Sequence, residues 1–343
     1  MRTIEWKDGV VVTIDQTRLP NELVFLNMEK CSDVASAIEN MKLRGAPLIG
    51  VAAAYGLALT AFHSKAKSKE DLIREVEESA RILRKTRPTA VNLFWAINRI
   101  VKKAHETSGD AKAVAKAITE EAHRMADEDV EVNRKIGEHG SKLLGDGDVV
   151  LTHCNAGSLA TVDYGTALGV IRAAWNQGKQ IKVIATETRP KLQGARLTVY
   201  ELKRDGIPVT LITDSMVGYV MSKQLVNQAV VGADRIVQDA VINKIGTFNI
   251  AVLAHEHGIP FYVAAPTSTM DLSHTSGDAV IEQRNPEEVT HLRSERIAPK
   301  DIEVINPAFD ITPMKYLSGI ITETGVLSPE DLKTLRESPK RRI

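Results

Sequence analysis

Six short apolar segments recur between helical stretches in the second half of the sequence, and this alternation constrains the fold more than any other feature. Strands that alternate with helices form βαβ units, in which the strands are parallel and helices cover both faces of the sheet. The sequence therefore predicts an α/β architecture with a mainly parallel sheet. The predicted strands lie at 149–152, 181–185, 209–212, 230–231, 261–264 and 320–321.

The first part of the sequence follows a different pattern. Apolar residues alternate over 4–14 on either side of Asp8-Gly9, a two-residue hairpin signal, and a third strand is predicted at 23–26. From residue 32 to about residue 144 the apolar spacing is helical. At the run Gly145-Asp146-Gly147-Asp148 the helical pattern stops. We therefore predict two domains: a helix-rich domain over 1–144 and a mainly parallel sheet domain over 145–343.

Charge and hydropathy exclude several classes of function. Lys plus Arg total 44 and Asp plus Glu total 44, and aromatic residues make up 4% of the chain. Nucleic-acid-binding proteins carry basic faces or aromatic platforms, so nucleic acid is not an expected partner. The longest apolar stretch, Leu48 to Phe62, is shorter than the ~20 residues that span a bilayer, and a buried helix is predicted there. Because the amino terminus is charged and lacks an apolar signal segment, we expect a cytoplasmic protein with no membrane partner.

Polar residues follow the predicted strands, and in open α/β sheets ligands bind beyond the carboxyl ends of the strands. His153 and Cys154 follow the first strand, and Glu187 follows the second. Asp214 follows the third strand and Asp234 follows the fourth. One rim of the sheet is therefore expected to gather a thiol and several carboxylates, and any chemistry is expected there.

The two cysteines must be judged separately, because Cys31 and Cys154 form no CxxC pair and no Cys/His cluster. This spacing argues against a disulfide framework and against structural zinc. Cys31 precedes Ser32, which is predicted to be a helix N-cap, and we assign Cys31 to packing. Cys154 lies at a strand end beside Asn-Ala-Gly-Ser, where the amides of a following helix favour a thiolate. An inert buried cysteine is the alternative, and the place at the rim favours a functional thiol.

Asp234 follows an apolar run in which an unpaired carboxylate is costly, so it must be paired, protonated or functional. The structural alternative is an ion pair with Arg235 or Arg189. Asp214 has two structural alternatives, a helix cap and an Asx turn. Glu187 has a structural alternative as well, an ion pair with Arg189.

Four segments place basic side chains or glycine amides at predicted helix starts, an arrangement that binds phosphate. Each alone is more often a turn or a solvated charge, whereas four in one chain favour a phosphorylated ligand. The sequence has no P-loop, no GxGxxG after a strand, no HExxH and no GxSxG, which argues against ATP, nicotinamide and zinc chemistry and against a serine nucleophile. The four segments are Arg44-Gly45-Ala46-Pro47, Thr86-Arg87-Pro88, Gln193-Gly194 and Asn243-Lys244-Ile245-Gly246.

In these segments the chain resembles the methylthioribose-1-phosphate isomerase family, which is related to the regulatory subunits of the guanine-nucleotide exchange factor of eukaryotic translation initiation. The resemblance implies a small helix-rich amino-terminal domain with a short antiparallel sheet, joined to a Rossmann-like domain that forms a homodimer. The resemblance covers nearly the whole length and is carried, in order, by IEWKDG, DQTRLP, RGAPLIGVAAAYG, TRPTAVNLFWAI, LTHCNAGSLATVDYGTAL, TETRPKLQGARLT, VGADRI, NKIGTFNIA, NPAFDITP and GIITETG.

The resemblance also implies roles for individual residues. The catalytic cysteine and aspartate of the family correspond to Cys154 and Asp234. No metal and no organic cofactor is implied. The phosphate and sugar contacts of the family correspond to Arg44, Gly45, Ala46, Arg87, Gln193, Asn243 and Lys244.

The reaction that this resemblance implies is the conversion of 5-methylthioribose 1-phosphate into 5-methylthioribulose 1-phosphate, an aldose–ketose isomerisation in methionine salvage. Two alternatives stay open. Related isomerases act on 5-deoxyribose 1-phosphate or ribose 1,5-bisphosphate and would share the cysteine, the aspartate and the contacts to the phosphate on carbon 1. A protein of a different class, a non-catalytic regulator that binds a sugar phosphate, would resemble the translation-factor subunits.

Overall fold

A computed structural model describes the chain over residues 1–88 and 90–332. The chain forms two compact units. Unit 1 comprises Met1–Arg134 and Gly157–Gly165, and unit 2 comprises Lys135–Ala156 and the described residues from Thr166 on. The chain passes from unit 1 to unit 2 inside one continuous helix, so no turn marks this point in the sequence. The boundary at Gly145 lies instead between that helix and the first strand of unit 2, and the domain limits predicted from the sequence stay a prediction.

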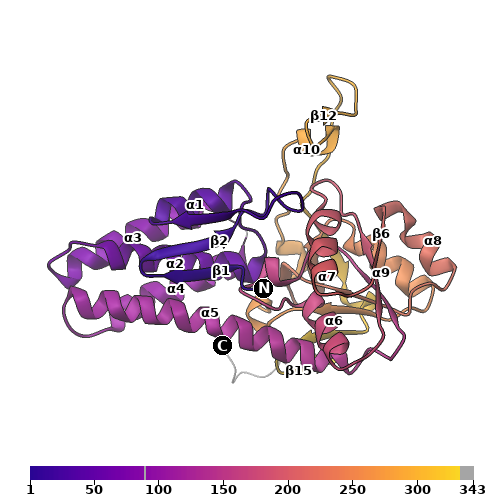
Figure 1. Ribbon diagram of the computed structural model, residues 1–343, viewed down its shortest axis with the longest axis horizontal. Coiled ribbons are helices and arrows are strands. Elements are labelled where there is room, and N and C mark those ends of the chain that lie inside the picture. Colours follow the sequence, from indigo (N-terminus) through magenta and orange to yellow (C-terminus); the bar gives the residue numbers. More distant parts are fainter. Residues whose placement is uncertain (89, 333–343) are drawn as a thin grey trace. The chain divides into compact units, whose positions relative to one another are not determined.

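Unit 1 begins with three antiparallel strands, coloured indigo in Figure 1: β1 (Ile4–Lys7), β2 (Val10–Ile14) and β3 (Phe25–Met28). The predicted turn at Asp8-Gly9 is present, with φ of 47° and 84°, as a two-residue hairpin turn requires. The third strand was predicted two residues too early. The Asp15 N–H donates to the carbonyl of Val24, 2.9 Å away, and pairing with β2 starts only after this contact.

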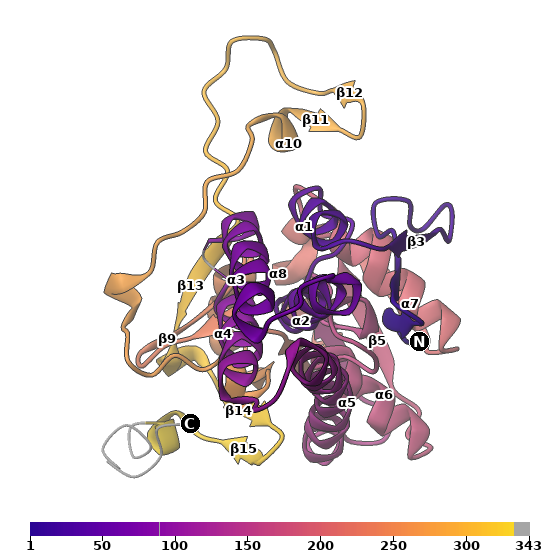
Figure 2. The ribbon, with the colours of Figure 1, turned by 90° about the vertical axis from the view of Figure 1, so that its left-hand side faces the viewer.

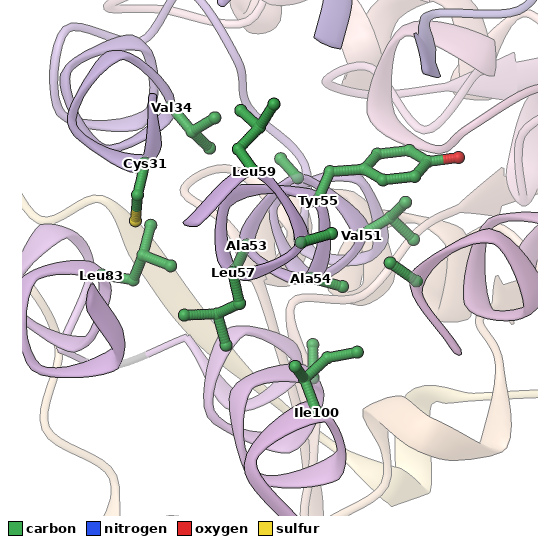
Figure 3. Close-up of a cluster of buried hydrophobic side chains, with 14 of the residues drawn as sticks. Cys31, Val34, Val51, Ala53, Ala54, Tyr55, Leu57, Leu59, Leu83 and Ile100 are labelled. Carbon is green, nitrogen blue, oxygen red and sulfur yellow. The ribbon is translucent and has the colours of Figure 1, made fainter. Parts of the chain in front are cut away.

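Helix α2 forms the core of unit 1 and packs against α1, α3 and α4. It is long and apolar enough to cross a membrane by length and composition, and 78% of its most apolar window is buried, as expected for a core helix. Figure 3 shows its side chains among residues from α1, α3 and α4. The prediction of a buried helix here is confirmed. The helices are α1 (Cys31–Glu39), α2 (Ala46–His63), α3 (Lys69–Thr86), α4 (Val91–Glu106) and α5 (Ala111–Ser141).

Cys31 is buried in this core, as predicted, and burial raises the pKa of its thiol to about 11. The expectation that Ser32 caps the helix was wrong, because α1 already begins at Cys31. The carboxylate of Asp33 accepts the backbone N–H groups of Glu29 and Lys30 at 3.1 and 3.0 Å. These two hydrogen bonds fix the start of the helix before Ser32.

Unit 2 contains a seven-stranded sheet in the order β15-β14-β10-β7-β4-β5-β6. The six predicted strands are all present and parallel, and β15 runs antiparallel at one edge. Along the chain, β4, β5 and β6 extend the sheet in one direction, and β7, β10 and β14 extend it in the other. The strands are β4 (Val149–Thr152), β5 (Lys182–Thr186), β6 (Val209–Ile212), β7 (Gln228–Val231), β10 (Phe261–Ala264), β14 (Gly319–Thr322) and β15 (Gly325–Leu327).

A second, three-stranded sheet of unit 2 follows β7 and has the order β13-β9-β8. It consists of β8 (Arg235–Ile236), β9 (Ala240–Lys244) and β13 (Phe309–Pro313). Figure 2 shows the extended segment that carries α10 (Glu287–Thr290), β11 (His291–Leu292) and β12 (Glu295–Arg296). The other helices of unit 2 are α6 (Ala167–Asn176), α7 (Val199–Arg204), α8 (Val217–Ser222) and α9 (Thr247–Glu256).

The segment Gly157–Gly165 is tied to the rest of unit 1 by side chains that bond to its backbone. The carboxylate of Asp129, on α5, accepts the N–H of Val162 at 2.7 Å, and the Thr3 hydroxyl donates to the carbonyl of Ser158 at 2.6 Å. Burial, which disfavours an ionised carboxyl group, raises the pKa of Asp129 to about 7. Above that pH the segment is therefore held by a charged group that burial penalises.

We predict that Asp129→Asn changes the pH dependence of stability. The pKa of an unfolded Asp is about 4, so the folded protein holds this proton more tightly, and ionisation costs stability as the pH rises from about 4 to about 7. Asn accepts the Val162 N–H without titrating. The melting temperature of the variant, relative to the parent, should therefore rise between pH 5 and pH 8. Thermal unfolding measures this difference in melting temperature between variant and parent, with Asp127→Asn on the same helix as the control. An equal difference in melting temperature at pH 5 and pH 8 would contradict the prediction.

Candidate active site

The two residues predicted to be catalytic follow neighbouring strands. Cys154 comes after β4 and Asp234 after β7, and these strands pair in parallel through Val150 and Gln228. The order of the sheet reverses between β4 and β7, and ligands of open α/β sheets bind at such a reversal. The sequence predicted one rim for both residues, and the topology places them at the switch point of that rim.

The backbone of Cys154 has a left-handed conformation, with φ of +61°. A residue with a Cβ atom in such a region costs of order 1–3 kcal/mol and persists only where its surroundings fix it. Here the Cys154 N–H donates to the Thr188 hydroxyl at 2.8 Å, and the Thr198 hydroxyl donates to the Cys154 carbonyl at 2.6 Å. The thiol-bearing residue is thus held at both of its peptide groups, and it is only partly buried.

Asp214 fixes the first of these two threonines. Its carboxylate accepts the N–H of Thr188 at 2.9 Å and the N–H of Arg189 at 2.7 Å. Thr188 itself is left-handed, with φ of +64°. Both predicted alternatives for Asp214, a helix cap and an Asx turn, were wrong, because its carboxylate oxygen atoms bind the loop after β5. Asp214 is itself the first residue of a short helix whose N-cap is Thr213.

The second threonine, Thr198, ends a π-helical turn over Gly194–Thr198 that leads into α7. Such turns are rare and are frequent at functional sites. Its hydroxyl also accepts a hydrogen bond from the Asn155 amide at 3.2 Å. A Cβ atom on Gly194 would lie 1.8 Å from the carbonyl oxygen of Thr186, so only glycine allows this turn to pack on β5.

Gln193 directly precedes the π-helical turn and presents an open hydrogen-bonding group. Its side chain is 3% exposed, and its Oε1 has no hydrogen-bond partner among the residues that the structure describes. Buried polar atoms are nearly always paired, so an unpaired oxygen is a position at which a ligand donor would bind. Gln193 is one of the residues that the sequence assigned to ligand contact.

Asp234 is half-buried, and its backbone N–H donates to the carbonyl of Ile242 at 3.0 Å. Both arginines that the sequence offered as partners of Asp234 contact other groups. Arg235 pairs with Asp271 at 2.5 Å, and Arg189 donates to the carbonyls of the 288–289 backbone and of its neighbour in the chain. The structural alternative for Asp234, an ion pair with either arginine, stays a prediction.

Asn243 and Lys244 end β9, and α9 starts three residues later. The Asn243 amide donates to the Thr247 hydroxyl at 2.9 Å, and the Lys244 ammonium donates to the carbonyl of Ala308 at 2.7 Å. Two amides at the start of α9 already have a carboxylate partner, because Asp310 accepts the N–H of Gly246 at 2.7 Å and that of Phe248 at 3.1 Å. A phosphate ligand would therefore have to use the side chains of Asn243 and Lys244 rather than the helix amides.

Unit 1 carries the other predicted ligand residues. Arg44 is buried, Gly45 is the N-cap of α2 with φ of +101°, and Ala46 is the first residue of that helix. A Cβ atom on Gly45 would lie 2.5 Å from the backbone of Ala160, so this position requires glycine. The bare amides of an N-terminal helix turn favour an anion. This helix start matches the prediction.

Arg87 differs from its prediction. It was expected at a helix start, but it is the residue after the end of α3, and α4 begins only at Val91. The following residue, Pro88, explains this, because the residue before a proline is disfavoured in the helical region and Arg87 is extended, with φ of −144°. Its guanidinium lies 3.5 Å from the sulfur of Met41, close in sequence to Arg44.

The residues that hold Cys154 were not predicted from the sequence. Thr188 and Thr198 were not singled out, and His153 was noted only as a neighbour. Threonine is common at strand ends, so nothing in the local pattern distinguishes these hydroxyls from solvent-facing ones. Among the described residues, no group of three or more His, Cys, Asp and Glu side chains could hold a metal ion.

We predict that Gly194→Ala destabilises the protein. The added methyl group would overlap the Thr186 carbonyl, and relief of the overlap must move the turn that carries Thr198, at a cost of about 1–3 kcal/mol or more. Denaturant unfolding measures the change. Gly218→Ala, in α8, is the control, because its Cβ atom would lie 3.6 Å from the nearest atom of Leu253 and should stabilise the helix by about 0.5–1 kcal/mol. Equal free energies of unfolding for the parent and Gly194→Ala would refute this packing.

Comparison with known proteins places this geometry in context. The sequence model of the Initiation factor 2 subunit family matches residues 42–329. A protein of Geotalea daltonii named methylthioribose-1-phosphate isomerase is 56% identical over 329 residues, which cover 95% of each chain. The crystal structure of 5-methylthioribose 1-phosphate isomerase from Pyrococcus horikoshii is similar with a TM-score of 0.92 at 49% identity, covering 98% of this chain and 95% of that one. The structure described as translation initiation factor eIF-2B, subunit delta, from A. fulgidus gives a TM-score of 0.88 at 50% identity, covering 97% and 99%.

Proposed function

We propose that this chain, which belongs to the Initiation factor 2 subunit family, is an isomerase that converts 5-methylthioribose 1-phosphate into 5-methylthioribulose 1-phosphate in methionine salvage. The observation that carries the proposal is the pairing of β4 with β7, which brings Cys154 and Asp234 to the switch point of the sheet. These are the residues to which the family resemblance gives the catalytic roles. Relatives over nearly the full chain that bear the isomerase name support the same activity.

The chemistry needs two groups that handle protons. The phosphate on carbon 1 prevents the sugar from opening to a free aldehyde, so the bond between carbon 1 and the ring oxygen must break while that oxygen takes up a proton. One hydrogen then moves from carbon 2 to carbon 1, and the hydroxyl on carbon 2 loses its proton to become the carbonyl. Substrate and product are isomers, so the atoms and electrons balance without an oxidant or reductant.

We assign the oxygen protons to Asp234 and acid/base chemistry at the reacting carbon or oxygen atoms to Cys154. The hydrogen of carbon 2 has two possible routes: removal as a proton and return to carbon 1, or a direct hydride shift to carbon 1. The same two residues serve both routes. In D2O the first route places deuterium on carbon 1 of the product and the second does not, so the product NMR spectrum distinguishes them.

The remaining assignments in this proposal concern binding and assembly. A buried oxygen without a partner at Gln193 supports ligand contact there, and the N-terminal amides of α2 support anion binding by unit 1. We propose that the protein acts in the cytoplasm as a homodimer and binds neither nucleic acid nor membranes. The residues proposed to contact the phosphate and sugar are Arg44, Gly45, Ala46, Arg87, Gln193, Asn243 and Lys244.

Two variants test the catalytic assignment. Cys154→Ser and Asp234→Asn keep the size of each side chain but remove the thiol and the carboxylate. Each should lower kcat by at least about a hundredfold, the scale of a lost acid/base group, while the melting temperature stays near that of the parent. Conversion of 5-methylthioribose 1-phosphate is followed by NMR, with Cys31→Ser as the control thiol variant. Near-parental turnover by either variant would disprove its catalytic role.

The alternatives differ in what surrounds carbon 5 of the sugar. A second phosphate needs basic groups there, whereas a methylthio group needs an apolar wall. Values of kcat/KM on 5-methylthioribose 1-phosphate, 5-deoxyribose 1-phosphate and ribose 1,5-bisphosphate, measured side by side, decide the substrate, and a preference for the bisphosphate would overturn our choice. The similarity to a structure named as a translation-factor subunit favours a non-catalytic regulator as the second candidate. No turnover of any of the three sugars would support that role.

A further inference from the structure

We propose that His153 is a positioning residue whose two ring nitrogens serve different parts of the site: Nδ1 holds the backbone of Cys154, and Nε2 holds the loop that carries Asn243 and Lys244. The kinetic test of this inference rests on the proposed function, whereas its physical basis is the geometry around the ring.

The protonation of His153 follows from its contacts. The ring is 2% exposed, and burial lowers the pKa of His153, so the imidazole is neutral and carries one N–H. Nε2 lies 2.9 Å from the carbonyl oxygen of Ile245, which only accepts hydrogen bonds, so Nε2 carries the hydrogen. Nδ1 must then be an acceptor, and the Thr186 hydroxyl, 2.6 Å away, donates to it.

This tautomer fixes the direction of a chain of hydrogen bonds that ends at Cys154. Because the Thr186 hydroxyl gives its hydrogen to His153, the Thr188 hydroxyl is left to donate toward the same group of acceptors: the Thr186 hydroxyl oxygen at 3.2 Å, the Thr186 carbonyl at 3.4 Å and Nδ1 at 3.5 Å. The Thr188 oxygen in turn accepts the N–H of Cys154 at 2.8 Å. Each hydrogen in the chain therefore points from Cys154 through the two threonines toward the ring. Loss of the acceptor at Nδ1 would release the Thr186 hydroxyl and weaken the orientation of the Thr188 hydroxyl that holds Cys154.

The other side of the ring contacts the loop after β9. A Cβ atom on Gly246 would lie 3.0 Å from Cε1 of His153, so glycine, with φ of +104°, lets this loop approach the imidazole. The hydrogen bond from Nε2 to Ile245 joins the same loop. The charged groups that face the ring are Asp214, whose Oδ1 lies 3.9 Å from Nδ1, and Lys244, which acts on it electrostatically.

The two nitrogens therefore make a prediction that a merely structural histidine does not make. Contacts through Nδ1 reach the residue proposed to perform the chemistry, so their loss should lower kcat. Contacts through Nε2 reach the loop proposed to bind the substrate, so their loss should raise KM. A histidine that only filled space would change both constants together in every variant.

Two substitutions separate the nitrogens. In His153→Gln the amide nitrogen can replace Nε2 and donate to Ile245, but no acceptor remains at the position of Nδ1. In His153→Asn the amide oxygen can replace Nδ1 and accept from Thr186, but no donor reaches Ile245. For His153→Gln we expect kcat to fall about tenfold while KM stays within about twofold of the parent value. For His153→Asn we expect KM to rise about tenfold, with a smaller loss of kcat than in His153→Gln. A tenfold change is roughly what the loss of one buried hydrogen bond causes. Equal changes in both variants, or none, would overturn the proposal.

A second pair of variants covers the case in which a substitution of His153 prevents folding. Thr186→Val removes the donor to Nδ1 and should reproduce the loss of kcat seen in His153→Gln. Thr186→Ser keeps the hydroxyl and should lose less kcat than Thr186→Val. Equal losses of kcat for Val and Ser would contradict the directed chain of hydrogen bonds.

The rate at which iodoacetamide alkylates Cys154 tests the proposal independently of the substrate. Mass spectrometry of the peptides separates Cys154 from buried Cys31, which serves as the internal control. The rate should differ from that of the parent by at least about threefold in His153→Gln and Thr186→Val and stay unchanged in His153→Asn, because only the first two lose the contact to Cys154. Unchanged rates in all variants would overturn the inference. If the parent converts no sugar phosphate, the proposed function fails while this measurement still decides the role of His153.

Discussion

A left-handed backbone at Cys154, held on both sides by threonine hydroxyls, is the constraint on which the rest of this site depends. Thr188 binds the N–H and Thr198 binds the carbonyl. Both threonines lie in the connection between β5 and β6, and each has its own support: Asp214 for Thr188 and the glycine-dependent π-helical turn for Thr198. The backbone of Cys154 is thus held by hydroxyl groups from one connection of the parallel sheet, and Asp214, which follows β6, supports that connection in turn.

The carboxylates of unit 2 show how charge is distributed around this constraint. Asp214 and Asp310 are occupied by backbone amides, of the loop after β5 and of the start of α9. Asp271 is paired with Arg235. Burial raises the pKa of Asp310 to about 6, so even a carboxyl group that caps a helix is influenced by its apolar surroundings. A neutral total charge therefore results from many local pairings rather than from an absence of charged sites.

Strong local patterns made much of the fold predictable from the sequence. The six parallel strands and the apolar helix α2 follow directly from runs of apolar residues, and the hairpin at Asp8-Gly9 follows from turn chemistry. The errors arose where a hydrogen-bond partner or a neighbouring residue overrode the structure that the local pattern favours. Hydrogen bonds to Asp33 start α1 one residue earlier than predicted, and Pro88 keeps Arg87 extended. Asp214 binds the loop after β5 instead of capping a helix.

The candidate site divides in the same way. The place of Cys154 and Asp234 at strand ends could be predicted, because both follow apolar strands that must be buried. The hydroxyls and the imidazole that fix Cys154 could not, because their role depends on which strands are neighbours, and that order is set by tertiary packing.

A crystal structure of Cys154→Ser with 5-methylthioribulose 1-phosphate tests the central claim most directly. We predict that carbons 1 and 2 lie about 3.5 Å from the substituted side chain and the Asp234 carboxylate, with Gln193 Oε1 bonded to the sugar. A sugar bound away from this rim, with Gln193 Oε1 still unpaired, would contradict the account.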